Sequence, residues 1–449
     1  MKNRDLTSGN ITAGLWAFAV PLMLGNVLQQ LYNLVDTWVV GKYIGDDALA
    51  AVGSSYTLLT FLTSVIIGLS LGTGSFISIA YGKKEKDAIR NGIFMSSILI
   101  AALTAAIMGG FYIFLDPIIA LLRVPDKLTA DMHTYLAYVF VGFFATYLYN
   151  YFSNVLRGMG NSSVPLIFLA VSVVLNVVLD LYFVIPLQMG IKGAAIATVI
   201  AQYGSGIGIL FYFLFACTEY RIRKEDMYWN KSHFKNILSL SGFTCLQQSM
   251  MNFGILMVQG VVNSFGSVVM AAFAVAVKID TIAYMPVQDF GNAFSVFVAQ
   301  NFGAGKTGRI RAGIRQAAAS VAVFCICISM LVCFFAEPLM RTFVDGANAE
   351  TVQIGAVYLR IEGSCYIGIG ILFMLYGYYR AIKRPFLSVI LTILSLGTRV
   401  LLANILSAVP AFGVVGIWVS IPIGWAIADL FGIWYYVVLQ KHAEDVPMQ

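Results

Sequence analysis

The chain has 449 residues, of which 59% are hydrophobic and only 11% are charged, and its formal net charge is +6. Soluble domains carry about 25% charged residues, so this composition, with a mean hydropathy of +0.82, excludes a soluble protein. The six cysteines form no C-x-x-C pair, and the three histidines fall at the ends of apolar runs or between them. We interpret the cysteines as small apolar packing residues and expect no histidine-based metal site within the membrane.

Apolar runs long enough to cross a bilayer, about 20 residues, recur along the whole chain. The first is too long for a signal-peptide core and no cleavage site follows it, so we expect it to be retained as a span. The alternating polarity of barrel strands is not seen. The sequence therefore predicts an all-α integral membrane protein with twelve transmembrane helices. They cover residues 13–40, 51–80, 91–115, 134–156, 164–186, 193–216, 237–263, 268–299, 312–335, 355–379, 386–408 and 412–438.

Lysine and arginine side chains gather in the loops on one side of these spans. Of the 28, five lie in the opposite loops, three lie within spans, and the remaining 20 share the side of the N-terminus. Because cytoplasmic loops carry the excess of positive charge, both termini are predicted to be cytoplasmic. The net charge reflects this bias and does not indicate nucleic-acid binding. The five cations of the opposite loops are Lys42, Arg123, Lys127, Lys192 and Arg341, and the three cations within spans are Lys278, Arg360 and Arg399.

The second half of the chain repeats the first. Gly45 and Gly266 are 221 residues apart, Arg157 and Arg380 are 223 apart, and similar pairs occur across five spans. Two parallel repeats, with the substrate cavity between them, are a transporter architecture. The predicted parts are an N-terminal six-helix lobe at 1–218, a cytoplasmic linker at 219–235 and a C-terminal six-helix lobe at 236–449.

Polar side chains follow one face of several predicted spans. In the first span they recur every three or four residues and end at Asp36, which places them on one helical face. The fifth span carries Asn176 and Asp180 four residues apart, and the sixth carries Thr198. At a rise of 1.5 Å per residue, the two carboxylates and Thr198 lie roughly 6–9 Å from the outer end of the apolar layer.

These residues predict a cation site. A charge at the bilayer centre costs about 2.5–3.5 kcal/mol, so an intramembrane carboxylate indicates function. We predict that Asp36, Asn176, Asp180 and Thr198 bind Na⁺ through their oxygens, or bind a proton, because two neighbouring carboxylates oppose each other's ionisation. The alternative is that they only hydrogen-bond between helices. We expect no other metal and no cofactor.

The second half does not copy this site. At an offset of 223, Asn176 corresponds to Arg399 and Asp180 to Ala403. We expect Arg399 either to stabilise the C-terminal half or to repel cations from it. The other polar groups of this half are interpreted mainly as structural pairs. They are Gln248, Asn252, Gln259, Asn263, Lys278, Asp280, Asp289 and Glu362.

Further residues of the spans are candidates for the substrate cavity and for a hinge. Pro21 lacks an amide hydrogen and clashes with the preceding turn, so we predict a kink or hinge there; the alternative is that it fits a packing groove. The aromatic face around Tyr147 can be a wall for substrates or bundle packing. The predicted cavity residues are Gln29, Asn33, Tyr147, Gln202, Gln248 and Gln288.

Glycine-rich segments have a structural interpretation. Residues 68–72 and 204–208 carry small side chains at spacings that allow membrane helices to approach closely. The segment 303–308 (G-A-G-K-T-G) resembles a nucleotide-binding loop, but such loops follow a strand and this one follows a predicted membrane helix. We therefore interpret it as a cytoplasmic turn.

Four motifs, taken together, resemble the MATE (multidrug and toxic compound extrusion) transporters, most closely the DinF-like and MepA-like bacterial members. They are Pro21 with L-Y-N-L-V-D-T-W-V-V-G at 31–41, the pair Asn176/Asp180, G-A-A-I-A-T at 193–198 and A-Q-N-F-G-A-G-K at 299–306. The resemblance covers nearly the whole chain, in order. It implies twelve helices in two lobes, alternating access, and a cation site at Asp36, Asn176, Asp180 and Thr198. The chain departs from some members at Gln247-Gln248, where those members carry an acidic residue.

We therefore interpret the chain as a secondary multidrug antiporter that exports organic, cationic amphipathic compounds in exchange for Na⁺ or H⁺. A flippase for a lipid-linked oligosaccharide is the alternative, although the spans hold more acidic than basic residues. An enzyme would need a nucleophile–base set or a metal motif, and neither is recognisable. We expect a monomer in a bacterial cytoplasmic membrane, with small organic substrates and lipids as its partners.

Overall fold

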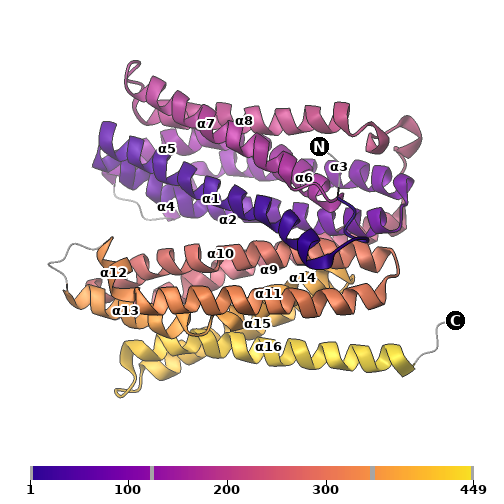
Figure 1. The fold of residues 1–449 in the computed structure, drawn as a ribbon. Helices are drawn as coiled ribbons and strands as arrows, with labels where there is room; N and C mark the ends of the chain where they lie inside the picture. The colour runs from indigo at the N-terminus through magenta and orange to yellow at the C-terminus, as the bar shows by residue number, and fades with distance from the viewer. Residues whose placement is uncertain (1–3, 122–125, 344–348, 446–449) are drawn as a thin grey trace. The chain divides into compact units, whose positions relative to one another are not determined.

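The computed structural model describes residues 4–121, 126–343 and 349–445. Across these ranges the chain is helical and contains no strand, which confirms the predicted all-α class (Figure 1). Arg123, one of the loop cations counted above, lies outside the described residues. Contacts divide the chain into two compact units. Unit 1 comprises residues 1–8, 17–245 and 303–305, and unit 2 comprises residues 9–16, 246–302 and 306–449.

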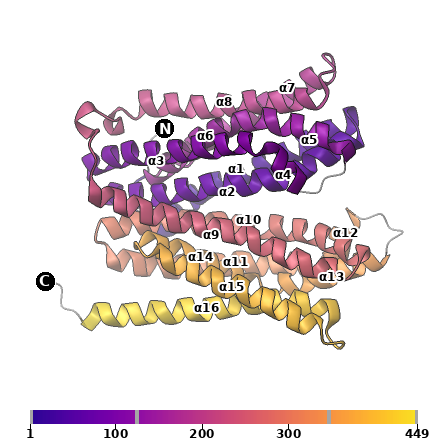
Figure 2. The same ribbon diagram turned by 180° about the vertical axis from the view of Figure 1, so that it is seen from behind.

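Unit 1 is built from the helices of the first repeat (Figure 2). In chain order they are α1 (Ile11–Tyr43), α2 (Asp46–Gly82), α3 (Lys86–Ile113), α4 (Leu115–Leu121), α5 (Asp126–Val139), the 3-10 turn Phe140–Gly142, α6 (Phe143–Gly158), α7 (Ser163–Val184) and α8 (Gly190–Ala216). The helix α7 packs along α8, and α2 packs against α5 and α6. Two short 3-10 turns, Thr218–Tyr220 and Lys224–Asp226, follow α8.

Unit 2 is built from the second repeat. Its helices are α9 (Lys231–Asn263), α10 (Ser267–Gly303), α11 (Thr307–Phe334), α12 (Ala336–Arg341), α13 (Ala349–Gly363), α14 (Tyr366–Ala381), α15 (Pro385–Ser407) and α16 (Gly413–Asp445). The first half of α9 packs within unit 1, and the helix passes into unit 2 at Leu246. The first turns of α1 likewise belong to unit 2, where Trp16 contacts Phe290 with ring centroids 5.1 Å apart.

The parallel repeat is present in the helices themselves. The starts of α2 and α10, α3 and α11, and α4 and α12 are each 221 residues apart, and those of α6 and α14 and of α8 and α16 are each 223 apart. The backbone repeats as well, because Gly45 and Gly266 both precede a helix with positive φ, 125° and 90°. Glycine adopts such angles at little cost. The two halves therefore share one architecture.

Two predicted continuous spans are interrupted. The span 134–156 is divided into α5 and α6 by the 3-10 turn at Phe140–Gly142, and the span 355–379 is divided into α13 and α14, which meet at 53°. The interruptions occupy equivalent positions of the two repeats. At the first, a side chain on Gly142 would overlap the amide of Gln202 on α8, so Gln202 lies directly against this glycine. Hydropathy gives no sign of the first break, because the residues around Phe140–Gly142 are apolar.

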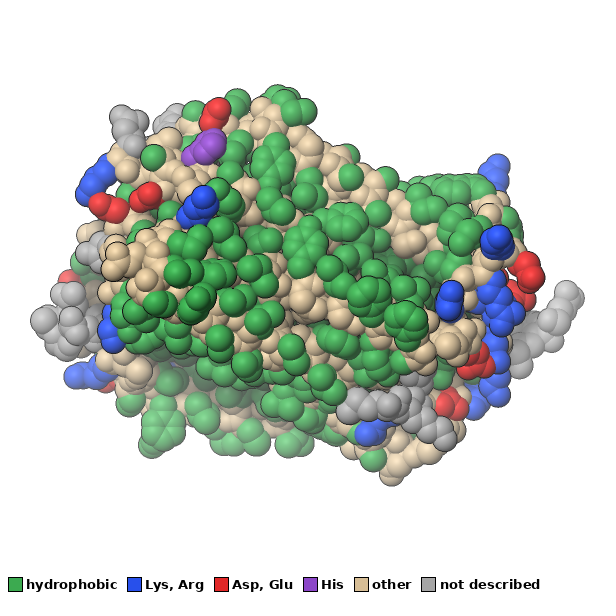
Figure 3. Space-filling view, turned by 90° about the horizontal axis from the view of Figure 1, so that it is seen from above, with side chains coloured by type: hydrophobic (Ala, Val, Ile, Leu, Met, Phe, Trp, Pro, Cys, Tyr) green, Lys and Arg blue, Asp and Glu red, His purple; other side chains and the backbone are tan. Residues whose placement is uncertain are grey.

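Nine helices within the described residues are individually long and apolar enough to span a membrane, or ten if the bent pair α13–α14 counts as one. The remaining two predicted spans correspond to α9 and to α5 with α6. The lipid-facing surface agrees with this assignment. Figure 3 shows the face over α7 and α8, which is hydrophobic across its middle, with charged side chains towards its ends. Val174 and Val178 of α7 and Phe215 of α8 are exposed.

The linker after α8 is fixed to the start of α3. Asp226 is buried, and its carboxylate forms an ion pair with Arg90 Nε at 3.0 Å. The side-chain amide of Asn91 donates hydrogen bonds to the backbone oxygens of Asp226 and Tyr228. Lys86 pairs with Glu219 beside them. The linker is therefore held against unit 1 by buried polar contacts.

We expect Asp226→Asn to release this linker, because losing one partner of a buried ion pair costs about 3–5 kcal/mol. In the purified protein, limited trypsin digestion within residues 219–235 should be at least tenfold faster than in wild type. Glu225→Gln is the matched control, since Glu225 is exposed and its loss should leave the rate unchanged. Equal digestion rates of wild type, Asp226→Asn and Glu225→Gln would show that the Arg90–Asp226 pair does not hold the linker in place.

Candidate functional site

Three helices of unit 1 carry the four residues predicted to bind a cation. Asp36 lies on α1, Asn176 and Asp180 on α7, and Thr198 on α8. All four are buried, with exposed fractions of 8%, 0%, 0% and 4%. The pairing of α7 with α8 explains why Thr198 accompanies the amide and carboxylate. Asp36 and Asp180 lie close enough to interact electrostatically.

The buried polar atoms of this group have few protein partners. Within the described part of the chain, Asp36 Oδ1, both side-chain atoms of Asn176, both oxygens of Asp180 and the Thr198 hydroxyl lack a hydrogen-bond partner. Buried polar groups in folded proteins are nearly always satisfied, so this concentration is exceptional. It is the arrangement expected of residues that bind an ion, and a poor arrangement for residues that only join helices.

Two tyrosines that the polar-stripe argument missed also belong to this region. Tyr32 precedes Asp36 by one helical turn on α1 and lies beside Thr198, and Tyr135 comes from α5. Both lie within electrostatic range of Asp36 and Asp180. A tyrosine one turn from a carboxylate can be found in the sequence, but tyrosine is common in membrane helices and its spacing alone did not single it out.

The oxygen ligands of this group suit a hard monovalent cation. Carboxylate, amide and hydroxyl oxygens are hard donors, and one or two negative charges inside the bilayer are stabilised by a bound cation or proton. Among the described residues, no three His, Cys, Asp or Glu side chains are grouped as in a transition-metal site. Asp36, Asn176, Asp180 and Thr198 are therefore the candidates for holding Na⁺ or a proton.

The predicted substrate-cavity residues are divided between the units. Gln29, Asn33 and Gln202 of unit 1 are half-buried, as are Gln248 and Gln288 of unit 2. Tyr147 is 3% exposed and donates a 3.1 Å hydrogen bond to the Ser97 carbonyl of α3. Its ring also contacts the rings of Phe144 and Tyr151.

Pro21 lies inside the continuous helix α1. It is five residues beyond Trp16, the last residue of this helix to pack with unit 2. The missing hydrogen bond of the proline therefore falls close to the point where α1 passes from one unit to the other. The hinge predicted at Pro21 lies close to this passage.

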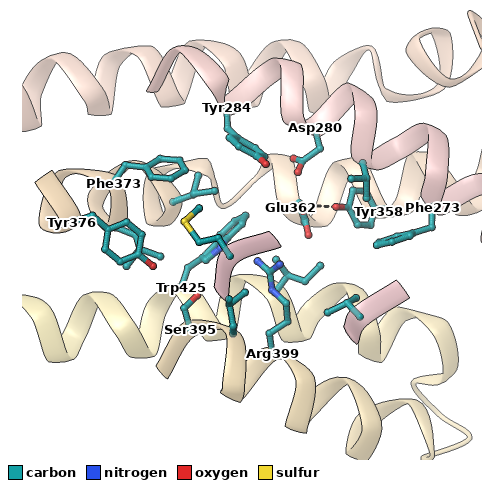
Figure 4. Close-up of a pocket in the computed structure, with 17 residues that line it drawn as sticks. Phe273, Asp280, Tyr284, Tyr358, Glu362, Phe373, Tyr376, Ser395, Arg399 and Trp425 are labelled. Atoms are coloured by element: carbon teal, nitrogen blue, oxygen red, sulfur yellow. Dashed lines mark hydrogen bonds between the residues drawn. The ribbon is translucent and has the colours of Figure 1, made fainter. Parts of the chain in front are cut away.

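A second polar cluster lies inside unit 2, where a cavity of about 80 Å³ is bordered by α9, α10, α13, α14, α15 and α16. Figure 4 shows Asp280, Glu362 and Arg399 directed into this space from three different helices. Tyr366 donates a 2.7 Å hydrogen bond to Asp280 and Tyr358 donates a 2.8 Å hydrogen bond to Glu362. Neither Gln248 nor Gln288 borders it.

Comparison with known proteins identifies the family. The family model MatE matches residues 21–182 and 243–405, one match in each repeat. The chain belongs to this family, the MATE transporters.

The MATE relatives include bacterial multidrug resistance proteins. The probable multidrug resistance protein YpnP of Bacillus subtilis is 30% identical over 399 residues, which cover 88% of each chain. The DNA damage-inducible protein F of Escherichia coli is 26% identical over 335 residues, 70% of this chain and 69% of that protein. The solved outward-facing structure of a multidrug resistance MATE transporter superposes with a TM-score of 0.91 at 23% identity, covering 98% and 99% of the two chains.

These similarities confirm the predicted family and the twelve-helix MATE fold. They establish a multi-pass membrane transporter with bacterial relatives, and they do not favour the flippase alternative. In the MATE framework, the buried group on α1, α7 and α8 lies inside the N-terminal repeat, and the cavity of Figure 4 lies inside the C-terminal repeat.

Proposed function

We propose that this MATE transporter exports organic, cationic amphipathic compounds in exchange for Na⁺ or H⁺, and that Asp36, Asn176, Asp180 and Thr198 bind the coupling ion. The observation that supports this proposal best is the burial of two neighbouring carboxylates, of whose four oxygens Asp36 Oδ1 and both Asp180 oxygens lack a hydrogen-bond partner among the described residues. The similarity to a probable multidrug resistance protein of Bacillus subtilis and to the multidrug export protein MepA of Staphylococcus aureus supports the substrate class.

The coupling mechanism follows from the cost of buried charge. With the site unoccupied by a cation or proton, the two carboxylates repel each other inside a medium that solvates charge poorly. Binding of Na⁺ or H⁺ removes this repulsion and draws α1 towards α7 and α8. An ion can shift a conformational equilibrium only through such a difference in affinity between two states, and the carboxylate pair supplies that difference.

The remaining parts of the proposal concern substrate and orientation. Gln29, Asn33 and Gln202 are the proposed polar contacts of the substrate in unit 1, and Gln248 and Gln288 those in unit 2. Both termini are proposed to be cytoplasmic, with the charged linker 219–235 on the same side, in the cytoplasmic membrane of a bacterium. The protein is proposed to act as a monomer.

The experiment that tests the function uses purified protein in liposomes loaded with ethidium, a fluorescent organic cation. Na⁺ and pH gradients of equal size are imposed separately across the membrane. Efflux accelerated by an inward gradient of one ion, and not by the membrane potential alone, supports antiport and identifies the ion. Equal efflux with and without both gradients would overturn the proposal.

Pro21→Ala should lower the turnover number several-fold and leave the KM for the exported cation nearly unchanged. The alanine restores the helical hydrogen bond, so α1 bends less easily where it passes between the units. The measurement is the rate of gradient-driven efflux at several substrate concentrations. Pro165→Ala is the control, because Pro165 lies in the first turn of α7, where a proline costs no hydrogen bond. Unchanged turnover in Pro21→Ala would leave this proline a packing role only.

A further inference from the structure

The cavity of unit 2 occupies the place that the proposed ion site occupies in unit 1. Three residues of the unit 1 site have counterparts bordering the unit 2 cavity at the constant offset of 223. The pairs are Tyr135 and Tyr358, Asn176 and Arg399, and Thr198 and Ile421. The repeat has therefore produced two interior sites at equivalent positions.

Their chemistry has diverged. In unit 2 the amide is replaced by the guanidinium of Arg399, and the hydroxyl of Thr198 by the apolar Ile421. The two carboxylates come from other positions, Asp280 on α10 and Glu362 on α13. Because Arg399 already places a positive charge beside these carboxylates, the cavity is suited to a ligand other than a metal cation.

Glu362 and Arg399, which carry opposite charges in this cavity, each have a buried atom without a hydrogen-bond partner among the described residues. Glu362 is 1% exposed, and its Oε2 accepts the hydrogen bond from Tyr358 while Oε1 has no partner within the described residues. Arg399 Nε is likewise without a partner there, and its guanidinium lies 5.9 Å from the centre of the Trp425 ring. Figure 4 shows both groups facing the same space. A buried acceptor atom and a buried donor atom that both lack a hydrogen-bond partner among the described residues thus border one cavity.

The size and walls of the cavity limit the ligand. A water molecule needs about 10–15 Å³ of such volume, so 80 Å³ corresponds to about five to eight waters, or a compound of roughly amino-acid size. Phe273, Tyr284 and Trp425 supply aromatic walls. Asp280 and Glu362 are hydrogen-bond neighbours, so the two carboxyl groups share one proton and the cavity holds one negative charge beside the positive charge of Arg399. A cationic compound would leave Arg399 unpaired, and an anionic compound would leave the carboxylate unpaired.

We propose that the cavity of unit 2 binds a small zwitterion with an apolar side group. Its ammonium group contacts Asp280 and Glu362, its carboxylate contacts Arg399, and its side group lies against the aromatic walls. Charge-assisted hydrogen bonds of this kind are roughly twice as strong as neutral ones. This site is a proposal beyond the efflux proposed above. Its test measures binding alone, so the result does not depend on whether the protein carries out ion-coupled transport.

Isothermal titration of the purified full-length protein with matched compounds tests the proposal. The probes are phenylalanine and leucine as zwitterions, phenylalaninamide as a cation, and N-acetylphenylalanine as an anion. At least one zwitterion should bind at least tenfold more tightly than the cation and the anion. Binding of the cation or the anion as tight as that of the zwitterions, or no binding of either zwitterion, would overturn it.

Charge-specific variants locate the binding. Arg399→Gln should weaken zwitterion binding at least tenfold and strengthen binding of phenylalaninamide, since the repelling cation is gone. Arg360→Gln is the matched control, because Arg360 is half exposed, pairs with Glu337 and does not border the cavity. A monodisperse elution profile shows that each variant is folded. If Arg399→Gln left zwitterion binding unchanged, or if Arg360→Gln weakened it equally, the zwitterion would not bind in the cavity of unit 2.

Discussion

Asp180→Asn is expected to reduce ion-driven efflux to the rate of protein-free liposomes while the protein stays folded. Asp180 is fully buried and neither of its oxygens has a hydrogen-bond partner among the described residues. The asparagine has nearly the same shape, but it cannot release and bind a proton or balance the charge of Na⁺. The variant should also be at least as heat-stable as wild type, because a buried charge costs about 2.5–3.5 kcal/mol. Asp36→Asn should have the same effect.

The controls separate a coupling role from a general effect of charge. Asp116→Asn removes a carboxylate whose side chain is 87% exposed, and its efflux should match wild type. Ala403→Asp, which places a carboxylate at the equivalent position of the other repeat, should change ion coupling far less than Asp180→Asn. Near wild-type efflux in Asp180→Asn would show that Asp180 does not couple the ion to transport. If Asp289→Asn or Glu362→Gln proved as damaging, coupling through one site would have to be abandoned.

Much of the fold can be predicted from this sequence because lipid imposes a simple rule. Every backbone amide in the membrane needs an internal partner, so each apolar run of sufficient length is a helix. The 221- and 223-residue offsets then give the parallel repeat. The polar stripe ending at Asp36 and the spacing of Asn176 and Asp180 indicate a buried group for the same reason, since polar residues in lipid-spanning helices turn inwards.

The remaining features depend on tertiary contacts that no local pattern encodes. The turn at Phe140–Gly142 packs against α8, where Gln202 lies beside Gly142. The carboxylates of the second cavity could not be found from the repeat, because Asp280 and Glu362 correspond to the apolar Leu59 and Val139 of the first half. Asp280 and Glu362 were expected to form structural pairs, and each does accept a tyrosine hydrogen bond. Their shared cavity with Arg399 appears only when three distant helices come together.

Gly72→Leu is expected to destabilise the protein by about 3 kcal/mol or more, because Gly72 lies where α2 crosses the first half of α9. A Cβ atom there would stand 2.5 Å from both the Leu240 carbonyl oxygen and the Ser241 nitrogen. The same crossing holds the 3.2 Å hydrogen bond between Thr73 and Ser241. Backbone atoms cannot move aside as a flexible side chain can, so the helices must separate. The measurement is the apparent Tm of the purified protein, together with its yield and monodispersity.

A matched glycine in the same repeat distinguishes steric overlap from the added bulk of leucine. Gly109 lies on α3, is exposed, and has no atom within 4 Å of its ideal Cβ among the described residues. Gly109→Leu should leave the apparent Tm unchanged or raise it slightly, because glycine is a poor helix former by about 1 kcal/mol. Gly72→Ala should lie between wild type and Gly72→Leu, since its single methyl group already meets the backbone of α9. A Tm for Gly72→Leu equal to that of Gly109→Leu would show that α2 and α9 do not depend on this close approach.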